Sequence, residues 1–243
     1  MSEILENFEF YILNETNMQN YLKYKLEDTS EPKKITKPYN VKNNKNSIFI
    51  PREQDTLFWC YYIIKNGDIK YETLNNRNIL TTKQLKIDYI SKIRENKPLI
   101  KPYKFDSIAN IESNLANDDN INIKTILTLC VIDNINLIFV SKKTYYEFFI
   151  SESSDIYIIY EVELQSKYIK KYGFEMATTE KLNEIYNTLY KIEIIDKPIK
   201  GLSAYKVCDL LNIANKLAIE TVNKETGKNK NKNELYESII QYF

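Results

Sequence analysis

Hydrophobic positions along the chain follow first a helical period and then an alternating one. The strongest helical segment runs from Asp55 to Asn66, where apolar and aromatic residues form one wide face. Asp55 can cap the start of this helix, and Gly67 is typical of the residue just after a helix end. Further helices are expected where apolar residues recur every three or four positions, at Thr81–Glu95, Ser107–Ala116, Asn122–Val131 and Thr178–Ile192.

The alternating pattern predicts strands that are rich in aromatic and β-branched residues. Three such segments are separated by short turns, at Asn136–Ser141, Thr144–Ile150 and Asp155–Val162. An edge strand is expected at Lys167–Phe174, and a short strand at Ser47–Ile50 ends before Pro51. The expected fold class is therefore α+β, in which helices accompany an antiparallel meander.

Breaks in the pattern divide the chain into four parts. Residues 1–27 are expected to form an N-terminal arm that packs on the main domain, which spans residues 47–197. Between them, residues 28–46 form a basic linker, and Pro198 and Gly201 separate the main domain from a small all-α module at 200–243. The linker offers accessory basic residues for a nucleic-acid partner, namely Lys33, Lys34, Lys37, Lys42 and Lys45.

Composition sets limits on the class of protein. The chain has 243 residues, of which 43% are hydrophobic and 28% charged, so it can form a packed core. A net charge of +1 argues against a protein that coats nucleic acid with its whole surface, but it leaves room for a local basic site. Lys far outnumbers Arg, and Ile, Asn and Tyr are frequent, as expected of an AT-rich genome.

Several cellular settings are disfavoured. Three scattered cysteines fit a reducing compartment better than a disulfide framework. The first residues are acidic, unlike a signal peptide, and no apolar run has the length of a membrane span. We therefore expect an intracellular protein without membrane contact.

The chain contains no histidine, which excludes histidine bases, Ser-His and Cys-His dyads and histidine-ligated metals. The cysteines lack the spacing of a zinc site, and no phosphate-binding glycine loop occurs. We expect no cofactor, no metal and no enzymatic activity.

The C-terminal module has a recognisable order of elements. A helix from Ser203 to Ala214 is followed by an extended link, a loop with one glycine and a helix from Asn233 to Tyr242. The second helix opens with Lys232, Glu234 and Leu235. This order is similar to that of the SAP family and of the N-terminal module of the terminator Rho.

That resemblance implies binding of DNA or RNA by basic residues around the second helix. The candidates are Lys224, Lys228, Lys230 and Lys232. The start of the second helix would add an anion site, because free backbone amides point out of it. The alternative is a helix pair that contacts other proteins, with the lysines in a solvated loop.

The stretch from Glu53 to Cys60 resembles the helix that carries the nucleophile in papain-like and OTU-type cysteine proteases. By that resemblance Thr56 stands where the catalytic cysteine would be, and Tyr145 or Tyr146 stands near the histidine position. The resemblance implies a degenerate papain-like fold, a pseudoprotease used for binding.

The whole chain resembles uncharacterised proteins of large nucleocytoplasmic DNA viruses, through residues 55–67, residues 128–140 and the C-terminal module. This implies a virion or viral-factory component. The sequence thus favours a non-enzymatic nucleic-acid-associated protein, and the alternative is a structural or adaptor protein that binds other proteins. DNA or RNA preference, oligomeric state and protein partner stay open.

Overall fold

The structure is a computed structural model that describes residues 48–74, 76–152, 155–162, 170–223 and 227–243. The chain divides into two units, residues 1–46 and residues 47–243. The expected arm at 1–27 and the basic linker at 28–46, with Lys33, Lys34, Lys37, Lys42 and Lys45, lie outside the described residues, as does Lys224.

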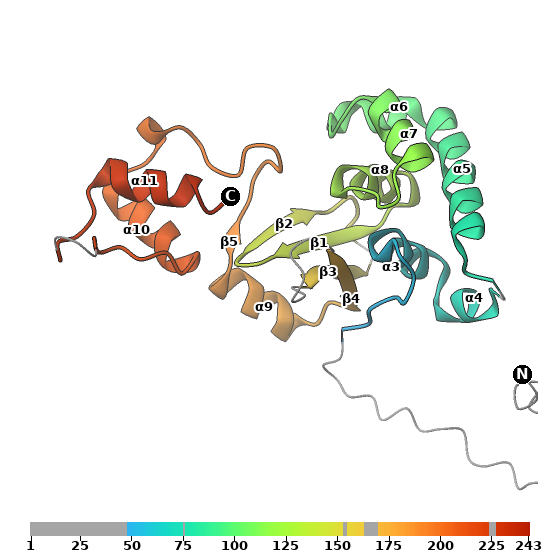
Figure 1. The fold of residues 1–243 in the computed structure, drawn as a ribbon, viewed down its shortest axis with the longest axis horizontal. Coiled ribbons are helices and arrows are strands. Elements are labelled where there is room, and N and C mark those ends of the chain that lie inside the picture. Colours follow the sequence, from blue (N-terminus) through green and yellow to red (C-terminus); the bar gives the residue numbers. More distant parts are fainter. Residues whose placement is uncertain (1–47, 75, 153–154, 163–169, 224–226) are drawn as a thin grey trace, which may run out of the picture. The chain divides into compact units, whose positions relative to one another are not determined.

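Residues 47–243 combine helices with one sheet (Figure 1). The α-helices are α3 (Thr56–Asn66), α4 (Asp68–Thr73), α5 (Ile79–Glu95), α6 (Lys97–Ile100), α7 (Ile108–Asn117), α8 (Ile123–Asp133), α9 (Thr179–Thr188), α10 (Val207–Lys216) and α11 (Lys232–Ile240). The strands are β1 (Asn136–Ser141), β2 (Thr144–Phe148), β3 (Ile156–Val162), β4 (Lys171–Met176) and β5 (Tyr190–Lys191). Short 3-10 helices occur at Lys101–Tyr103 and Leu202–Ala204. The mixed α and β character expected from the sequence is confirmed.

The sheet is mixed, so the predicted antiparallel meander was wrong. Its strand order is β4-β3-β1-β2-β5, in which β1 pairs with β3 in parallel and with β2 antiparallel. The chain leaves β2 and crosses to the far side of β1 before β3 begins. Burial explains this arrangement, because Ile158 and Ile159 of β3 are both fully buried on opposite faces, as expected of a central strand and not of an edge.

The buried side chain of Asn136 holds this crossover in place. Its Oδ1 accepts hydrogen bonds from the backbone N–H groups of Ile150 (2.8 Å) and Ser151 (3.2 Å), and its Nδ2 donates to the Ser151 carbonyl (2.5 Å). The start of β1 is thereby tied to the segment that carries the chain from β2 to β3.

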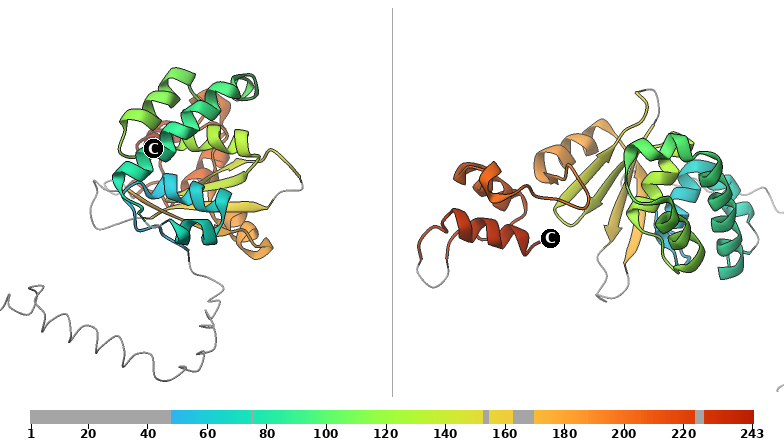
Figure 2. Two further views of the ribbon diagram at one scale, coloured as in Figure 1. Left: turned by 90° about the vertical axis from the view of Figure 1, so that its right-hand side faces the viewer. Right: turned by 90° about the horizontal axis from the view of Figure 1, so that it is seen from above.

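Helices cover both faces of the sheet (Figures 1 and 2). On one face α3, α5, α7 and α8 enclose the principal core, to which Leu137 and Ile159 contribute from the strands. On the other face α9 packs through Ile185 against Ile138 and Ile158. Successive strand residues therefore supply opposite layers, as the pleat requires.

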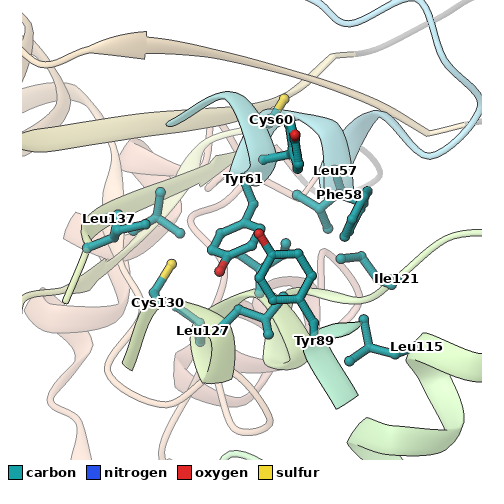
Figure 3. Close-up of a cluster of buried hydrophobic side chains, with 14 of the residues drawn as sticks. Leu57, Phe58, Cys60, Tyr61, Tyr89, Leu115, Ile121, Leu127, Cys130 and Leu137 are labelled. Atoms are coloured by element: carbon teal, nitrogen blue, oxygen red, sulfur yellow. The ribbon is translucent and has the colours of Figure 1, made fainter. Parts of the chain in front are cut away.

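The principal core is rich in tyrosine (Figure 3). The rings of Tyr61 and Tyr89 lie 5.4 Å apart in an edge-on contact, and the Tyr61 hydroxyl donates to the Asp133 carboxylate. Lys65 pairs with the same carboxylate, so this half-buried acid has two partners. Cys130 is packed in the same cluster.

The C-terminal module has its own apolar cluster, formed by Leu210, Ile213, Ala214, Leu217, Leu235 and Ile239. It is joined to the sheet by specific contacts. The Tyr242 hydroxyl accepts a hydrogen bond from the Lys143 N–H (3.0 Å), and the Phe243 ring lies 6.2 Å from that of Tyr190. Lys216 donates to the carbonyl of Leu189 just after α9 (3.2 Å).

Within the described part of the chain, none of the helices combines the length and the apolar character that crossing a bilayer requires.

Candidate functional site

The basic segment of the C-terminal module leads directly into α11. Val222 and Asn229 form an isolated antiparallel bridge, and Gly227 adopts a left-handed conformation (φ 65°) inside the turn that this bridge closes. A side chain at that φ is strained, so glycine suits the turn. The chain then runs from Lys228 to Lys232, where α11 begins.

Three of the predicted lysines occupy alternate positions in this segment. Lys228 is exposed, whereas Lys230 and Lys232 are half-buried. The three lysines fall within five consecutive residues, so their positive charges lie close together along the chain at the start of α11. The Lys230 Nζ donates to the Ser238 hydroxyl on α11 (2.9 Å), which fixes the link against the helix.

A capping box occupies the start of α11, where the sequence led us to expect an anion site. The Asn231 side chain accepts from the Glu234 N–H (3.0 Å), and the Glu234 carboxylate accepts from the Asn231 N–H (2.7 Å). This capping box satisfies backbone donors and places a negative charge at the helix start. We therefore assign the proposed phosphate contacts to lysine side chains.

The positions that resemble a protease are not brought together. The Thr56 side chain is buried, and its Oγ1 accepts a hydrogen bond from the Tyr172 N–H of β4 (2.9 Å). Tyr145 is buried on the opposite face of the sheet, where its ring lies 5.6 Å from that of Tyr186. Tyr146 packs on the α3 side of β2.

Strand order sets the distance between these positions. The hydrogen-bond partner of Thr56 is on β4, and Tyr146 is on β2, three places away in the sheet. At about 4.8 Å per strand this separates them by about 14 Å, whereas a nucleophile and its base need about 3 Å. Thr56 and either tyrosine therefore cannot act as a catalytic pair.

The cysteines near this region are structural. Cys60 and Cys130 are both buried, and burial raises the pKa of each thiol. The Cys60 thiol also donates to the Tyr172 carbonyl (3.6 Å). A thiol with a raised pKa is a poor nucleophile at neutral pH.

A cavity of about 430 Å³ lies between the start of α3, the start of α5 and the loop after α7. No pattern in the sequence indicated this cavity. Its floor holds an ion pair in which Lys86 Nζ lies 2.7 Å from Asp55 Oδ2, with the two side chains 3% and 2% exposed. Lys86 also donates to the carbonyls of Asp118 and Asp119, both at 3.2 Å.

Asp55 is fully engaged as well. Its Oδ1 accepts from the Phe58 N–H of α3 (3.2 Å), and its Oδ2 accepts from the Ile121 N–H (3.0 Å). Burial raises the pKa of Asp55, and the neighbouring Lys86 opposes that shift. The pair joins α3, α5 and the loop before α8. Because the hydrogen-bonding groups of both side chains already have partners, the pair offers no free acid or base for chemistry.

Among the described residues no three His, Cys, Asp or Glu side chains gather in a way that could hold a metal ion. Comparisons with protein-family models, with curated proteins and with solved structures found no match.

Proposed function

We propose that the protein binds nucleic acid without catalysing a reaction, and that the C-terminal module makes the contacts. The observation that carries this proposal is the link from Lys228 to Lys232, which presents lysines at alternate positions with no acid between them. Lys224, which lies outside the described residues, is a fourth candidate. The resemblance to SAP and Rho modules supports the same assignment.

The charge balance around this link supports an anionic partner. The nearest acid along the chain, Glu234, is engaged with the backbone of Asn231. Lysine ammonium groups act as point charges and do not read bases in the bidentate way of arginine. The proposal is therefore binding to phosphates with little sequence preference and with strong dependence on salt.

The test is a fluorescence-anisotropy titration of the full chain with labelled duplex and single-stranded oligonucleotides at low salt. The variant K228Q/K230Q/K232Q is compared with K70Q/K83Q/K101Q, which removes three lysines that are exposed on the helical part of the main domain. The proposal expects the first variant to lose most of the affinity and the second to bind like the wild type. Equal losses in both would contradict a specific site.

A second candidate function is protein binding through the main domain. Ile79 and Leu80, which are consecutive at the start of α5 and line the cavity, are 61% and 77% exposed. Exposed apolar side chains that lie near one another are typical of surfaces that contact other proteins. If the protein binds no nucleic acid at low salt, this adaptor function becomes the better supported of the two.

A further inference from the structure

A second pocket lies where the C-terminal module meets the sheet. It measures about 410 Å³, within the range of small-ligand sites, and it is lined by Val140, Lys142, Lys143, Tyr160, Glu161 and Tyr242. β1 and β3 end at this edge of the sheet, whereas β2 and β4 begin there. The pocket therefore combines the turn between β1 and β2 with an aromatic residue from the C-terminal module.

The contacts between turn and module shape the pocket. The Tyr242 hydroxyl accepts the Lys143 N–H, so the turn holds this tyrosine by its polar end. The Lys142 Nζ lies 5.6 Å from the centre of the Tyr242 ring. Tyr160 forms another part of the lining, and its hydroxyl is engaged with Glu175 (2.7 Å). Two aromatic rings and two lysines thus surround one space.

The charge at this edge is positive. Lys142 and Lys143 are exposed, and Lys170 and Lys171 stand at the start of β4, at the same edge of the sheet. The acid that lines the pocket, Glu161, is already bound by the Ser141 hydroxyl (2.8 Å) and by Lys170 (2.9 Å). Among the residues that the structure describes here, an anionic ligand would therefore meet ammonium groups before it met an unpaired carboxylate.

We propose that this pocket holds one nucleotide of a single-stranded nucleic acid, with the base against Tyr242 and the phosphate at Lys142 and Lys143. The proposal rests on the proposed function and makes it more specific. Bases are free to stack on aromatic side chains only when they are unpaired, so the pocket selects single strands over duplexes. Lys232 is the first residue of α11, and Tyr242 lies just after its end. Ten residues at helical rise span about 15 Å, so one nucleic-acid strand that runs along α11 can reach both sites.

The test uses the full chain and three labelled probes, namely short single-stranded DNA, short single-stranded RNA and a duplex of equal length. The variant K142Q/K143Q should weaken single-strand binding about 5- to 20-fold and leave duplex binding nearly unchanged. Its slope of log affinity against log salt should become shallower by about 0.7, which corresponds to the one phosphate of a single strand that the two lysines hold. Comparing the DNA and RNA arms shows which strand is preferred.

The aromatic contribution is tested separately. Tyr242→Leu removes the ring and should weaken single-strand binding about 5- to 100-fold, whereas Tyr242→Phe keeps the ring and should bind within about threefold of the wild type. Thermal unfolding of each variant checks that the module still folds. Because the phenylalanine variant lacks the bond to Lys143 but keeps the ring, it separates stacking from a loss of structure.

The outcomes distinguish this proposal from the one before it. If K142Q/K143Q binds single strands like the wild type while K228Q/K230Q/K232Q loses affinity, the pocket is refuted and the module function stands. Equal losses on duplex and single strand, with no effect of Tyr242→Leu, would also refute a nucleotide pocket. If the wild type binds none of the probes, both proposals fail.

Discussion

Replacing Lys86 with methionine would test the account of the buried ion pair. The substitution keeps the long apolar stem beside Phe58 but leaves the Asp55 carboxylate without its cation. Breaking a buried pair by removing one partner typically costs about 3–5 kcal/mol in the free energy of unfolding. The carbonyls of Asp118 and Asp119 lose a donor too, but both residues line the cavity, where water can replace the lost donor.

The sign of the pH dependence follows from Asp55. Its pKa is already raised above 3.8 in the folded protein by burial, and removal of Lys86 takes away the charge that opposes this rise. An acid with a raised folded pKa favours the folded state at low pH, and this contribution is lost as pH rises through the folded pKa. The cost of Lys86→Met should therefore be smaller at about pH 5 than at about pH 7.

Urea denaturation of the wild type, Lys86→Met and the double variant D55N/K86M at both pH values measures these effects. The double variant should lose less stability than Lys86→Met at pH 7, because no uncompensated charge remains. A loss below about 1 kcal/mol for Lys86→Met, or a loss that grows on acidification, would refute this reading of the pair.

Three further predictions concern the fold. Asn136→Leu removes the three hydrogen bonds that hold the crossover. It should lower the free energy of unfolding, measured by urea denaturation, by about 2–4 kcal/mol. A loss near zero would mean that the crossover does not depend on these bonds. Gly173→Ala places a Cβ 2.5 Å from Ile48 Cγ2 and 3.0 Å from the Phe49 carbonyl, so it should lower the free energy of unfolding by about 1–3 kcal/mol and speed amide exchange at Phe49. Unchanged stability and exchange would mean that the 48–50 segment is not packed tightly on β4. Iodoacetamide should label Cys208 in the native protein, and rapid labelling of a buried cysteine in native buffer would contradict the packing of the core.

The sequence allowed local elements to be predicted where the side chains themselves determine them. The helix after Asp55 and its end at Gly67 followed from capping residues and an apolar face, and α3 has these limits. In the C-terminal module the expected start at Ser203 was too early, because Ser203 lies in a separate 3-10 turn. The α-helix begins at Val207, where the Asp209 carboxylate accepts the Lys206 N–H.

Long-range features could not be predicted in the same way. Alternation identifies a strand but does not say which strand is its neighbour, so the parallel pairing of β1 with β3 was missed. The role of Asn136 depends on where the chain returns after β2. Lys86 looks like a surface lysine in the sequence, and only the approach of Asp55 and the 118–119 carbonyls makes it a buried one.

In the candidate site, too, local features could be predicted from the sequence and long-range contacts could not. Lysines at 228, 230 and 232 were identified from the sequence, whereas the capping box that closes the start of α11 requires the Glu234 carboxylate to reach Asn231. Lys142 and Lys143 gave no signal, because their significance depends on Tyr242, about a hundred residues later in the chain, lying against the turn.

The salt dependence of nucleic-acid binding tests the central claim most directly. The affinity of the full chain for a duplex is measured by anisotropy between about 50 and 200 mM salt, beside K228Q/K230Q/K232Q. Three phosphate contacts predict that the slope of log affinity against log salt becomes shallower by about 2.7 in the variant. Equal slopes in the two proteins, or no binding by the wild type at the lowest salt, would contradict the assignment of this module as the nucleic-acid interface.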